Sequence, residues 1–290
     1  MNATAQVEYE SRVRIKFGVV AFLAALFLVA SQLFELAGPH SSVTELTLEL
    51  IVDSQRKTLD IVGAVCDLIG LLALGFLLNW LFDISRARNP GMRRVTRWLS
   101  SVGCAMAAVM AVADTVVLVG KANTFVTTGT QSYPQAYTLT SGGLVILLQL
   151  LLQLGILLLT LGCIWTSLNA MRVGLLPRMI GYVGVIAGAL FLFPIPVIVP
   201  VIQGFWLAAV AVTLWARWPS GDPPAWAAGE SIPWAPVNSA AAQRQQAAQT
   251  RRQRRRVSTQ EVLAAVETKE PREGAPSPST SASKRKRKRK

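Results

Sequence analysis

The sequence predicts an all-α integral membrane protein, in which a bundle of six transmembrane helices is followed by a disordered basic C-terminal tail. The first observation is composition: the 290 residues are 52% hydrophobic, and the mean hydropathy is +0.41. The second is length, because the apolar residues gather in runs of about 20, which a helix needs to cross a bilayer. The third is charge, because Lys and Arg gather in every second connection, as the positive-inside rule requires of a chain that crosses repeatedly.

Six apolar runs are the expected spans. None of them shows the alternation of polar and apolar residues that membrane strands need, and backbone groups in lipid have to be paired within the span, so each run is expected to be a helix. They form a predicted membrane domain of residues 1–218, ahead of a tail of residues 219–290. The spans are expected at residues 17–37, 61–82, 98–120, 142–168, 179–193 and 197–216.

The last two spans depend on proline and charge. Residues 179–216 form one nearly continuous apolar stretch, which Pro194, Pro196 and Pro200 interrupt. Proline restricts its own backbone and that of the preceding residue, which favours two short spans with a turn at residues 193–196. A single span would carry the tail to the opposite side of the membrane. Since the tail is strongly basic, the positive-inside rule favours two spans.

Basic residues also predict the orientation of the bundle. Five arginines fall within residues 86–97, in the second connection, whereas the third connection, residues 121–141, contains only Lys121. The sequence therefore predicts that the N-terminus and the C-terminus are both cytoplasmic. Tryptophans at the predicted cytoplasmic ends are expected to form an interfacial belt. They are Trp80, Trp98, Trp165, Trp215 and Trp218.

Two connections leave their structure open. In the first, residues 38–60, Ser42 and Glu45 have the spacing of a capping box, which predicts the start of a helix that leads into the second span. Leucines at alternate positions from residue 46 fit a strand equally well. The third connection is rich in Thr, Ser and Gln and is expected either to cover the bundle or to be mobile.

Polar side chains within the expected spans gather at one depth. At a rise of about 1.5 Å per residue, the deeper ones lie roughly 9–11 Å below the outer boundary of their spans. Small residues accompany the two acids on their helix faces, which favours contact with neighbouring helices over contact with lipid. This candidate intramembrane polar site consists of Asp67, Asp114, Gln149, Gln153, Glu35 and Gln203.

The polar site has two interpretations, and both stay open. In one, it lines an outward-open cavity in which Asp67 and Asp114 bind a cation or a proton, because acids inside a membrane are costly and mark functional sites. In the other, protonated acids and glutamines form hydrogen bonds between helices and stabilise the bundle. The sequence favours the second, because such contacts are common and modest in energy.

The tail carries most of the net charge of the protein. Residues 217–290 contain 16 Lys and Arg against six Asp and Glu, and their composition predicts disorder. Each basic residue near an anionic leaflet contributes about 1 kcal/mol, so the tail is expected to bind anionic lipid head groups. Nucleic acid or another polyanion is the alternative. Two clusters supply the charge: Arg251, Arg252, Arg254, Arg255, Arg256, Lys284, Arg285, Lys286, Arg287, Lys288, Arg289 and Lys290.

Two functions are consistent with these features. The first is a small transporter or permease-like protein that uses the polar site. The second is a non-catalytic membrane scaffold whose tail recruits an acidic partner, and nothing in the sequence identifies a protein partner. An enzyme, a cofactor or a metal site is not predicted, because the sequence contains no catalytic or metal-binding motif. Cys66, Cys104 and Cys163 lie far apart and are expected to be small buried hydrophobic residues.

One stretch carries a family resemblance. Pro177-Arg178-Met179-Ile180-Gly181-Tyr182-Val183-Gly184, followed by Gln203-Gly204-Phe205-Trp206-Leu207-Ala208, resembles the last two spans of bacterial multi-spanning membrane proteins of unknown function that are common in high-GC genomes. The resemblance extends loosely over residues 10–218 and leaves out the tail. It implies a multi-pass protein of the bacterial plasma membrane, and it brings no active residues.

Overall fold

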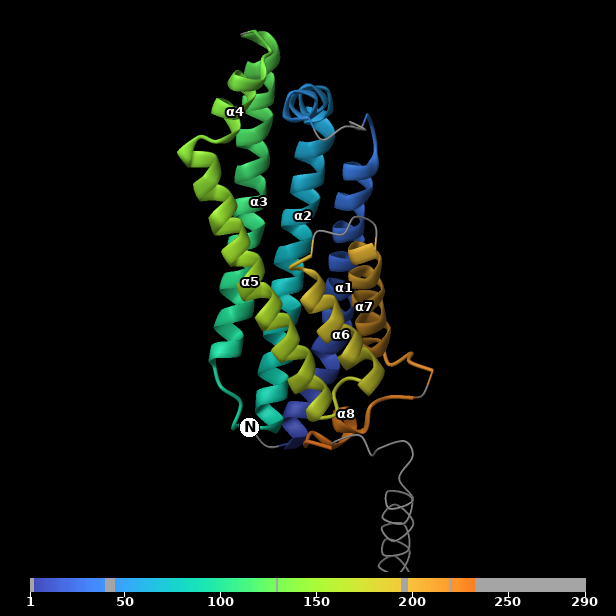
Figure 1. Ribbon diagram of the computed structural model, residues 1–290. Helices are drawn as coiled ribbons and strands as arrows, with labels where there is room; N and C mark the ends of the chain where they lie inside the picture. Colours follow the sequence, from blue (N-terminus) through green and yellow to red (C-terminus); the bar gives the residue numbers. More distant parts are fainter. Residues whose placement is uncertain (1–2, 40–44, 129, 194–197, 220, 233–290) are drawn as a thin grey trace, which may run out of the picture. The chain divides into compact units, whose positions relative to one another are not determined.

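The computed structural model of the chain describes residues 3–39, 45–128, 130–193, 198–219 and 221–232, and all regular structure within these ranges is helical (Figure 1). The predicted turn around Pro194 and Pro196 and the basic clusters of the tail lie outside these ranges. The helices are α1 (Ala3–Leu36), α2 (Leu46–Arg88), α3 (Val95–Thr127), α4 (Tyr133–Thr140), α5 (Gly143–Arg172), α6 (Arg178–Leu190), α7 (Ile198–Leu214) and α8 (Pro224–Ala228).

Four helices are long and apolar enough to cross a membrane: Val7–Leu36 within α1, and the whole of α2, α3 and α5. This confirms the all-α fold class and gives the described chain the character of a membrane protein. The helices α6 and α7 are apolar but contain only 13 and 17 residues. At about 1.5 Å per residue they are roughly 20 and 26 Å long.

Small residues let the long helices pack closely. A Cβ atom added to Gly103 of α3 would lie 2.3 Å from the backbone nitrogen of Leu159 in α5, so the two helices touch backbone to backbone there. A Cβ atom at Gly70 of α2 would lie 2.8 Å from the Leu28 side chain of α1. The helix α7 packs on α1, and α6 packs on α5 and α7. Close contacts of this kind stabilise the packing of helices in a membrane. Lipid is as apolar as the helix surfaces, so the hydrophobic effect does not drive the helices together.

The two ends of the bundle differ. We call one the arginine end: it consists of the beginning of α1, residues 89–94, residues 173–177 and α8. The other, the α4 end, consists of the end of α1, the beginning of α2, and α4. There, Leu50, Phe125 and Ala136 form a small separate core, so the third connection covers the bundle.

Residues 46–60 of the first connection are helical, which excludes the strand, and Ser42 of the predicted capping box lies outside the described residues. The helix α2 has 43 residues, or about 64 Å, twice the roughly 30 Å of hydrocarbon in a bilayer. Its first turns therefore precede the apolar run of residues 61–82, and Figure 1 shows them turned across the rest of the helix.

The packed part of the chain continues past residue 218. Residues 221–232 lie against the arginine end, where Asp222 accepts a 2.7 Å hydrogen bond from Arg14 and the Trp226 indole donates to the Leu175 carbonyl at 3.0 Å. Gly174, with φ +82°, makes this possible, because a Cβ atom there would lie 2.0 Å from the Ile232 carbonyl oxygen.

Trp80 is not part of an interfacial belt. It is only 7% exposed and stacks between Phe17, at 4.2 Å between ring centroids, and Trp226, at 6.0 Å. The reason is the packing of residues 221–232, which covers the position where Trp80 would otherwise meet the membrane surface. Trp98 and Trp165, in contrast, are 69% and 47% exposed, as residues at an interface are.

Candidate functional site

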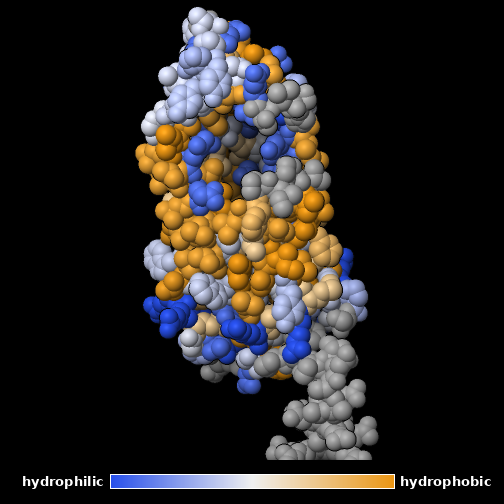
Figure 2. Space-filling view, in the orientation of Figure 1, coloured by the Kyte–Doolittle hydropathy of each residue, from blue (hydrophilic) through white to orange (hydrophobic). Residues whose placement is uncertain are grey.

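Two adjoining hollows enter the bundle from its α4 end. The first, which we call the vestibule, has a volume of about 350 Å³ and is lined by α1, α2 and α3. The second, the chamber, has a volume of about 240 Å³ and is lined by α1, α2, α3, α5, α7 and residues 190–193. Figure 2 shows the hollowed face, with hydrophilic residues around the opening and apolar surface beside and below it. The hollows share five lining residues: Ser31, Gln32, Glu35, Asp67 and Ala111.

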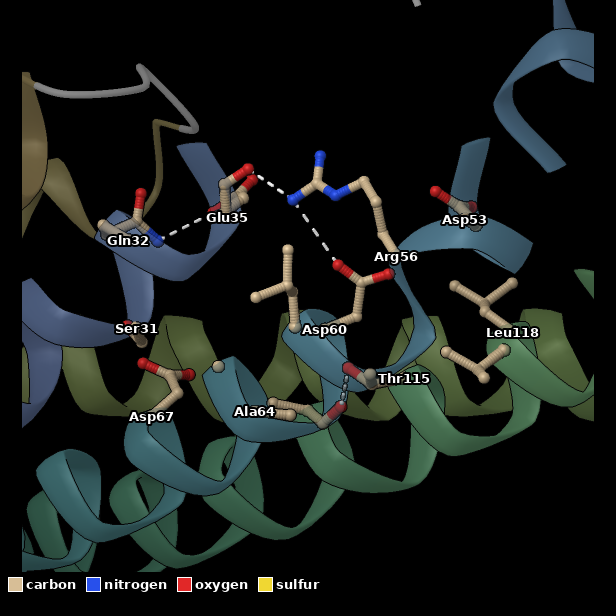
Figure 3. Close-up of a pocket in the computed structure, with 14 residues that line it drawn as sticks. Ser31, Gln32, Glu35, Asp53, Arg56, Asp60, Ala64, Asp67, Thr115 and Leu118 are labelled. Carbon is tan, nitrogen blue, oxygen red and sulfur yellow. Dashed lines mark hydrogen bonds and ion pairs between the residues drawn. The ribbon is translucent and has the colours of Figure 1, made fainter. Parts of the chain in front are cut away.

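The wall of the vestibule contains an arginine that joins two helices. Arg56 of α2 is 8% exposed and donates hydrogen bonds to the backbone carbonyls of Phe34 and Glu35, near the end of α1, where unpaired carbonyls attract positive charge. Its guanidinium also lies 3.5 Å from the Asp60 carboxylate. Figure 3 shows the guanidinium between Glu35 and Asp60, with Gln32 donating a 2.9 Å hydrogen bond to the Glu35 carboxylate.

The polar lining of α2 follows one face of the helix. Asp53, Arg56, Asp60, Ala64 and Asp67 succeed one another at steps of three or four residues, and all of them line the vestibule. Three of them, Asp53, Arg56 and Asp60, were missed as site residues. The signal was present in the sequence, because this spacing is helical. The spacing places these side chains on one face only if residues 46–60 are helical, and their alternating leucines fit a strand equally well.

Asp53 lies in the part of α2 that precedes the apolar run. Burial and the neighbouring carboxylates of Asp60 and Glu49 together raise the pKa of Asp53 to about 6, against the opposing effect of the positive charge of Arg56. This carboxyl therefore gains most of its negative charge as the pH rises from about 5 to about 7.

Asp67 lies deeper than the other acids of α2, in the wall that the vestibule and the chamber share. It points towards Ser31 of α1 (Figure 3). Within the ranges that the structure describes, the ion pairs involve other acids, and no Lys or Arg is paired with Asp67. Its carboxylate is thus open to a guest from either hollow.

The chamber combines apolar walls with a buried amide. Leucine, isoleucine, valine and phenylalanine side chains supply most of its lining. Gln203 of α7 also lines it; this residue is only 6% exposed, and its Nε2 atom has no hydrogen-bond partner among the described residues. Buried polar groups nearly always find a partner, so an open amide in a cavity wall is the mark of a place for a guest molecule or water.

The remaining sequence candidates lie at the same level but on other faces. Gly75 of α2 packs against Cys104 of α3, and Gly103 of α3 packs against Leu159 of α5, so these contacts align the three helices along the bundle. In this alignment, the three residues Asp67, Asp114 and Gln149 lie within about one helical turn of each other.

Asp114, Gln149 and Gln153 nevertheless are not among the described residues that line the hollows. Asp114 is half-buried, with an unpartnered Oδ1, and both glutamines are exposed on α5. Of the six candidates, the structure thus brings Asp67, Glu35 and Gln203 together and leaves three apart. The spans and the topology predicted the shared depth of these residues, but the sequence did not predict which face of α5 packs against the other helices.

The carboxylates of the hollows do not converge on one point. Among the described residues, no three His, Cys, Asp or Glu side chains are grouped closely enough to hold a metal ion. No protein-family model, curated protein or solved structure matches the chain. The vestibule thus combines acidic side chains with Arg56, and the chamber combines Asp67 and Glu35 with mainly apolar walls.

Proposed function

We propose that the chain is a six-span protein of the bacterial plasma membrane, with both termini cytoplasmic, and that α6 and α7 are its fifth and sixth spans. Of the 14 Lys and Arg residues in the described ranges, 11 lie towards the arginine end: Arg12, Arg14, Lys16, Arg86, Arg88, Arg93, Arg94, Arg97, Arg172, Arg178 and Arg217. By the positive-inside rule that end is cytoplasmic. The hollows then open towards the outside.

Labelling of single cysteines tests this topology. In a variant with Cys66, Cys104 and Cys163 replaced by Ala, a cysteine at Thr130 should react with an impermeant maleimide in intact cells. A cysteine at Arg93 or at Ser239 should react only after the cells are opened. Reaction of the Ser239 position in intact cells would leave an odd number of spans and contradict the proposal.

We propose further that the vestibule and the chamber bind a positively charged solute or a proton, as the binding site of a small transporter or permease-like protein. One observation carries this proposal: Asp67 lies in the wall common to both hollows and has no Lys or Arg partner among the described residues. An acid within a membrane protein is costly unless it is paired or has a function. Gln203, buried and open towards the same space, supports it.

Charge movement in proteoliposomes tests this function. The full chain is reconstituted on a solid-supported membrane, and solutions of protons, tetramethylammonium and larger organic cations are applied in turn. A cation that the protein binds should give a transient current that Asp67→Asn removes. Asp114→Asn is the matched control, because Asp114 lies at the same level outside the hollows, and it should keep the current. If no cation gives a current that depends on Asp67, the proposal fails.

A second function is favoured by the charge of the tail, with its ten net positive charges over residues 217–290. In this alternative the protein is a scaffold that recruits anionic lipid or another polyanion. A variant that ends at residue 232 keeps the contacts of residues 221–232 with the bundle. It should keep the Asp67-dependent current and lose binding to vesicles that contain anionic lipid. Undiminished vesicle binding would exclude the tail as the anion-binding segment.

A further inference from the structure

We propose that the chamber takes an organic cation with an apolar body, and not a hydrated inorganic ion. This inference rests on the proposed function, because it names the class of solute for the same site. Its first support is charge: among the described residues, the charged side chains that line the chamber are Glu35 and Asp67, both acidic, whereas Arg56 lines only the vestibule. The charge of the described chamber lining is therefore negative.

The second support is the character of the walls. Leu152, Ile156 and Leu159 of α5 face the guest on one side, and Phe191 and Phe193 lie near the end of α6. An inorganic cation needs several oxygen ligands in place of its water, and among the described residues no three His, Cys, Asp or Glu side chains are grouped closely enough to hold a metal ion. Apolar side chains instead gain free energy by covering an apolar guest, and phenylalanine rings attract an organic cation through their faces.

The third support is the amide of Gln203. It is more than nine-tenths buried, it lines the chamber, and its nitrogen is unpartnered among the described residues. Without a guest or a water molecule in the chamber, this buried donor lacks a partner among the described residues, which is energetically unfavourable. A guest that brings a polar atom, or a water molecule held between guest and wall, relieves that cost.

The fourth support is the position of α6. Gly181, Gly184 and Gly188 pack it against Met171, Ser167 and Cys163, which all belong to the second half of α5. These glycines do not pack α6 against the first half of α5, and Figure 2 shows apolar surface beside and below the opening of the hollow. A solute with an apolar body that dissolves in the membrane surface is therefore able to approach the opening along apolar surface.

Equilibrium binding to the full chain in nanodiscs of neutral lipid tests the inference. The probes are benzyltrimethylammonium, tetramethylammonium and neopentylbenzene, which is the uncharged counterpart of the first. Benzyltrimethylammonium should bind at least about tenfold more tightly than tetramethylammonium, since only the former has a ring to bury. Neopentylbenzene should not displace it. Asp67→Asn should weaken benzyltrimethylammonium binding at least about tenfold, and Asp114→Asn should leave it unchanged.

Substitution of the wall separates recognition from folding. Phe191→Ala should weaken benzyltrimethylammonium binding about fivefold or more, through loss of apolar contact with the benzyl ring. Tetramethylammonium has no such ring, so its binding should be unchanged. Phe205→Ala, at a residue 55% exposed on α7 that lies outside the lining, should change neither. Unchanged tetramethylammonium binding in Phe191→Ala also shows that the variant is folded.

Failure of this inference differs from failure of the proposed function. If protons or tetramethylammonium give an Asp67-dependent signal while benzyltrimethylammonium binds no better than tetramethylammonium, the solute class is wrong and the cation site stands. Displacement by neopentylbenzene as strong as by its cationic counterpart overturns the role of charge. If no probe binds in a way that depends on Asp67, both proposals fall.

Discussion

The arginine end and the hollows both place charged side chains inside the bundle. The buried Arg14 and Arg88 of the arginine end have carboxylate partners, whereas Asp67 in the hollows has no Lys or Arg partner among the described residues. The Arg88 guanidinium, with a side chain 0% exposed, donates to both carboxylate oxygens of Glu10, at 2.6 and 2.9 Å, and to the Ala225 carbonyl at 3.0 Å. Trp226 lies between this arginine and Arg14, whose Cζ is 4.3 Å from the ring centroid. Asp67 has no comparable set of partners among the described residues.

This difference separates structural charge from functional charge. Removing one member of a buried pair leaves the other unsatisfied, so a saturated network such as Glu10 with Arg88 holds elements in place. An acid that borders an open hollow and has no basic partner remains able to bind a solute. Charged residues thus stabilise the packing at the arginine end, whereas in the hollows they are available to bind a solute.

The largest effect is expected at the buried pair. Arg88→Met should lower the free energy of unfolding by about 3–5 kcal/mol, because Glu10 would stay buried without its partner. Denaturant or thermal unfolding in detergent measures this loss. The matched control is Arg97→Met, which breaks the exposed pair with Asp83, and it should cost less than about 1 kcal/mol. Equal losses in both variants would show that the buried pair has no special role.

The aromatic contact at the arginine end should rank next. Trp226→Ala removes the ring that stacks on Trp80 and lies over the two arginines, with an expected loss of about 3 kcal/mol. Trp98→Ala is the control, because Trp98 is 69% exposed. Limited proteolysis gives a second readout: cleavage between residues 218 and 232 should become faster in Trp226→Ala alone. Unchanged cleavage would mean that other contacts hold this segment.

In the hollows, the same kind of change should hardly affect stability. Asp67→Asn keeps the shape of the side chain and should change the free energy of unfolding by less than about 1 kcal/mol, because its polar contacts are few and such contacts between helices are weak. Glu10→Gln, measured beside it, should lose several times as much. If Asp67→Asn unfolds as readily as Glu10→Gln, Asp67 is a structural residue and the comparison between the two regions breaks down.

The helices themselves were predictable, because apolar runs and small residues determine where chains cross and approach in lipid. The depth of Asp67 and its helix-facing side followed from the same patterns. Gln149 and Gln153 show the limit: both were expected in the intramembrane polar site, but they are exposed, and leucines on the other faces of α5 are equally able to contact a neighbouring helix. Nothing in the periodicity of a helix that is apolar all round fixes its rotation.

The arginine end was out of reach for a different reason. Glu10 and Arg88 are 78 residues apart, and Arg14 and Asp222 are 208 apart. Pairing between residues so far apart in the sequence depends on which elements the fold brings together, and the spacing of residues within one helix does not predict it. Trp80 accordingly fitted an interfacial belt as well as the aromatic stack in which it lies. The stripe of Asp53, Arg56 and Asp60 was different, since helical spacing alone would have revealed it.

The smallest expected effect concerns the mouth of the vestibule. Asp53 carries a negative charge above its pKa of about 6 and loses it below. It faces Asp60, Arg56 and Glu49, and it lies far from Asp67 along α2, so its electrostatic attraction for a cation in the chamber is weak and long-range.

At low salt and pH about 7.5, Asp53→Asn should therefore weaken benzyltrimethylammonium binding only about twofold. At pH about 5 the wild-type carboxyl is already protonated, so the ratio of the two dissociation constants should approach one. Titrations of both proteins at the two pH values measure this ratio, which cancels the contribution of every other titrating group. A ratio that stays constant with pH would show that the charge of Asp53 does not reach the chamber, and that the vestibule and the chamber act independently.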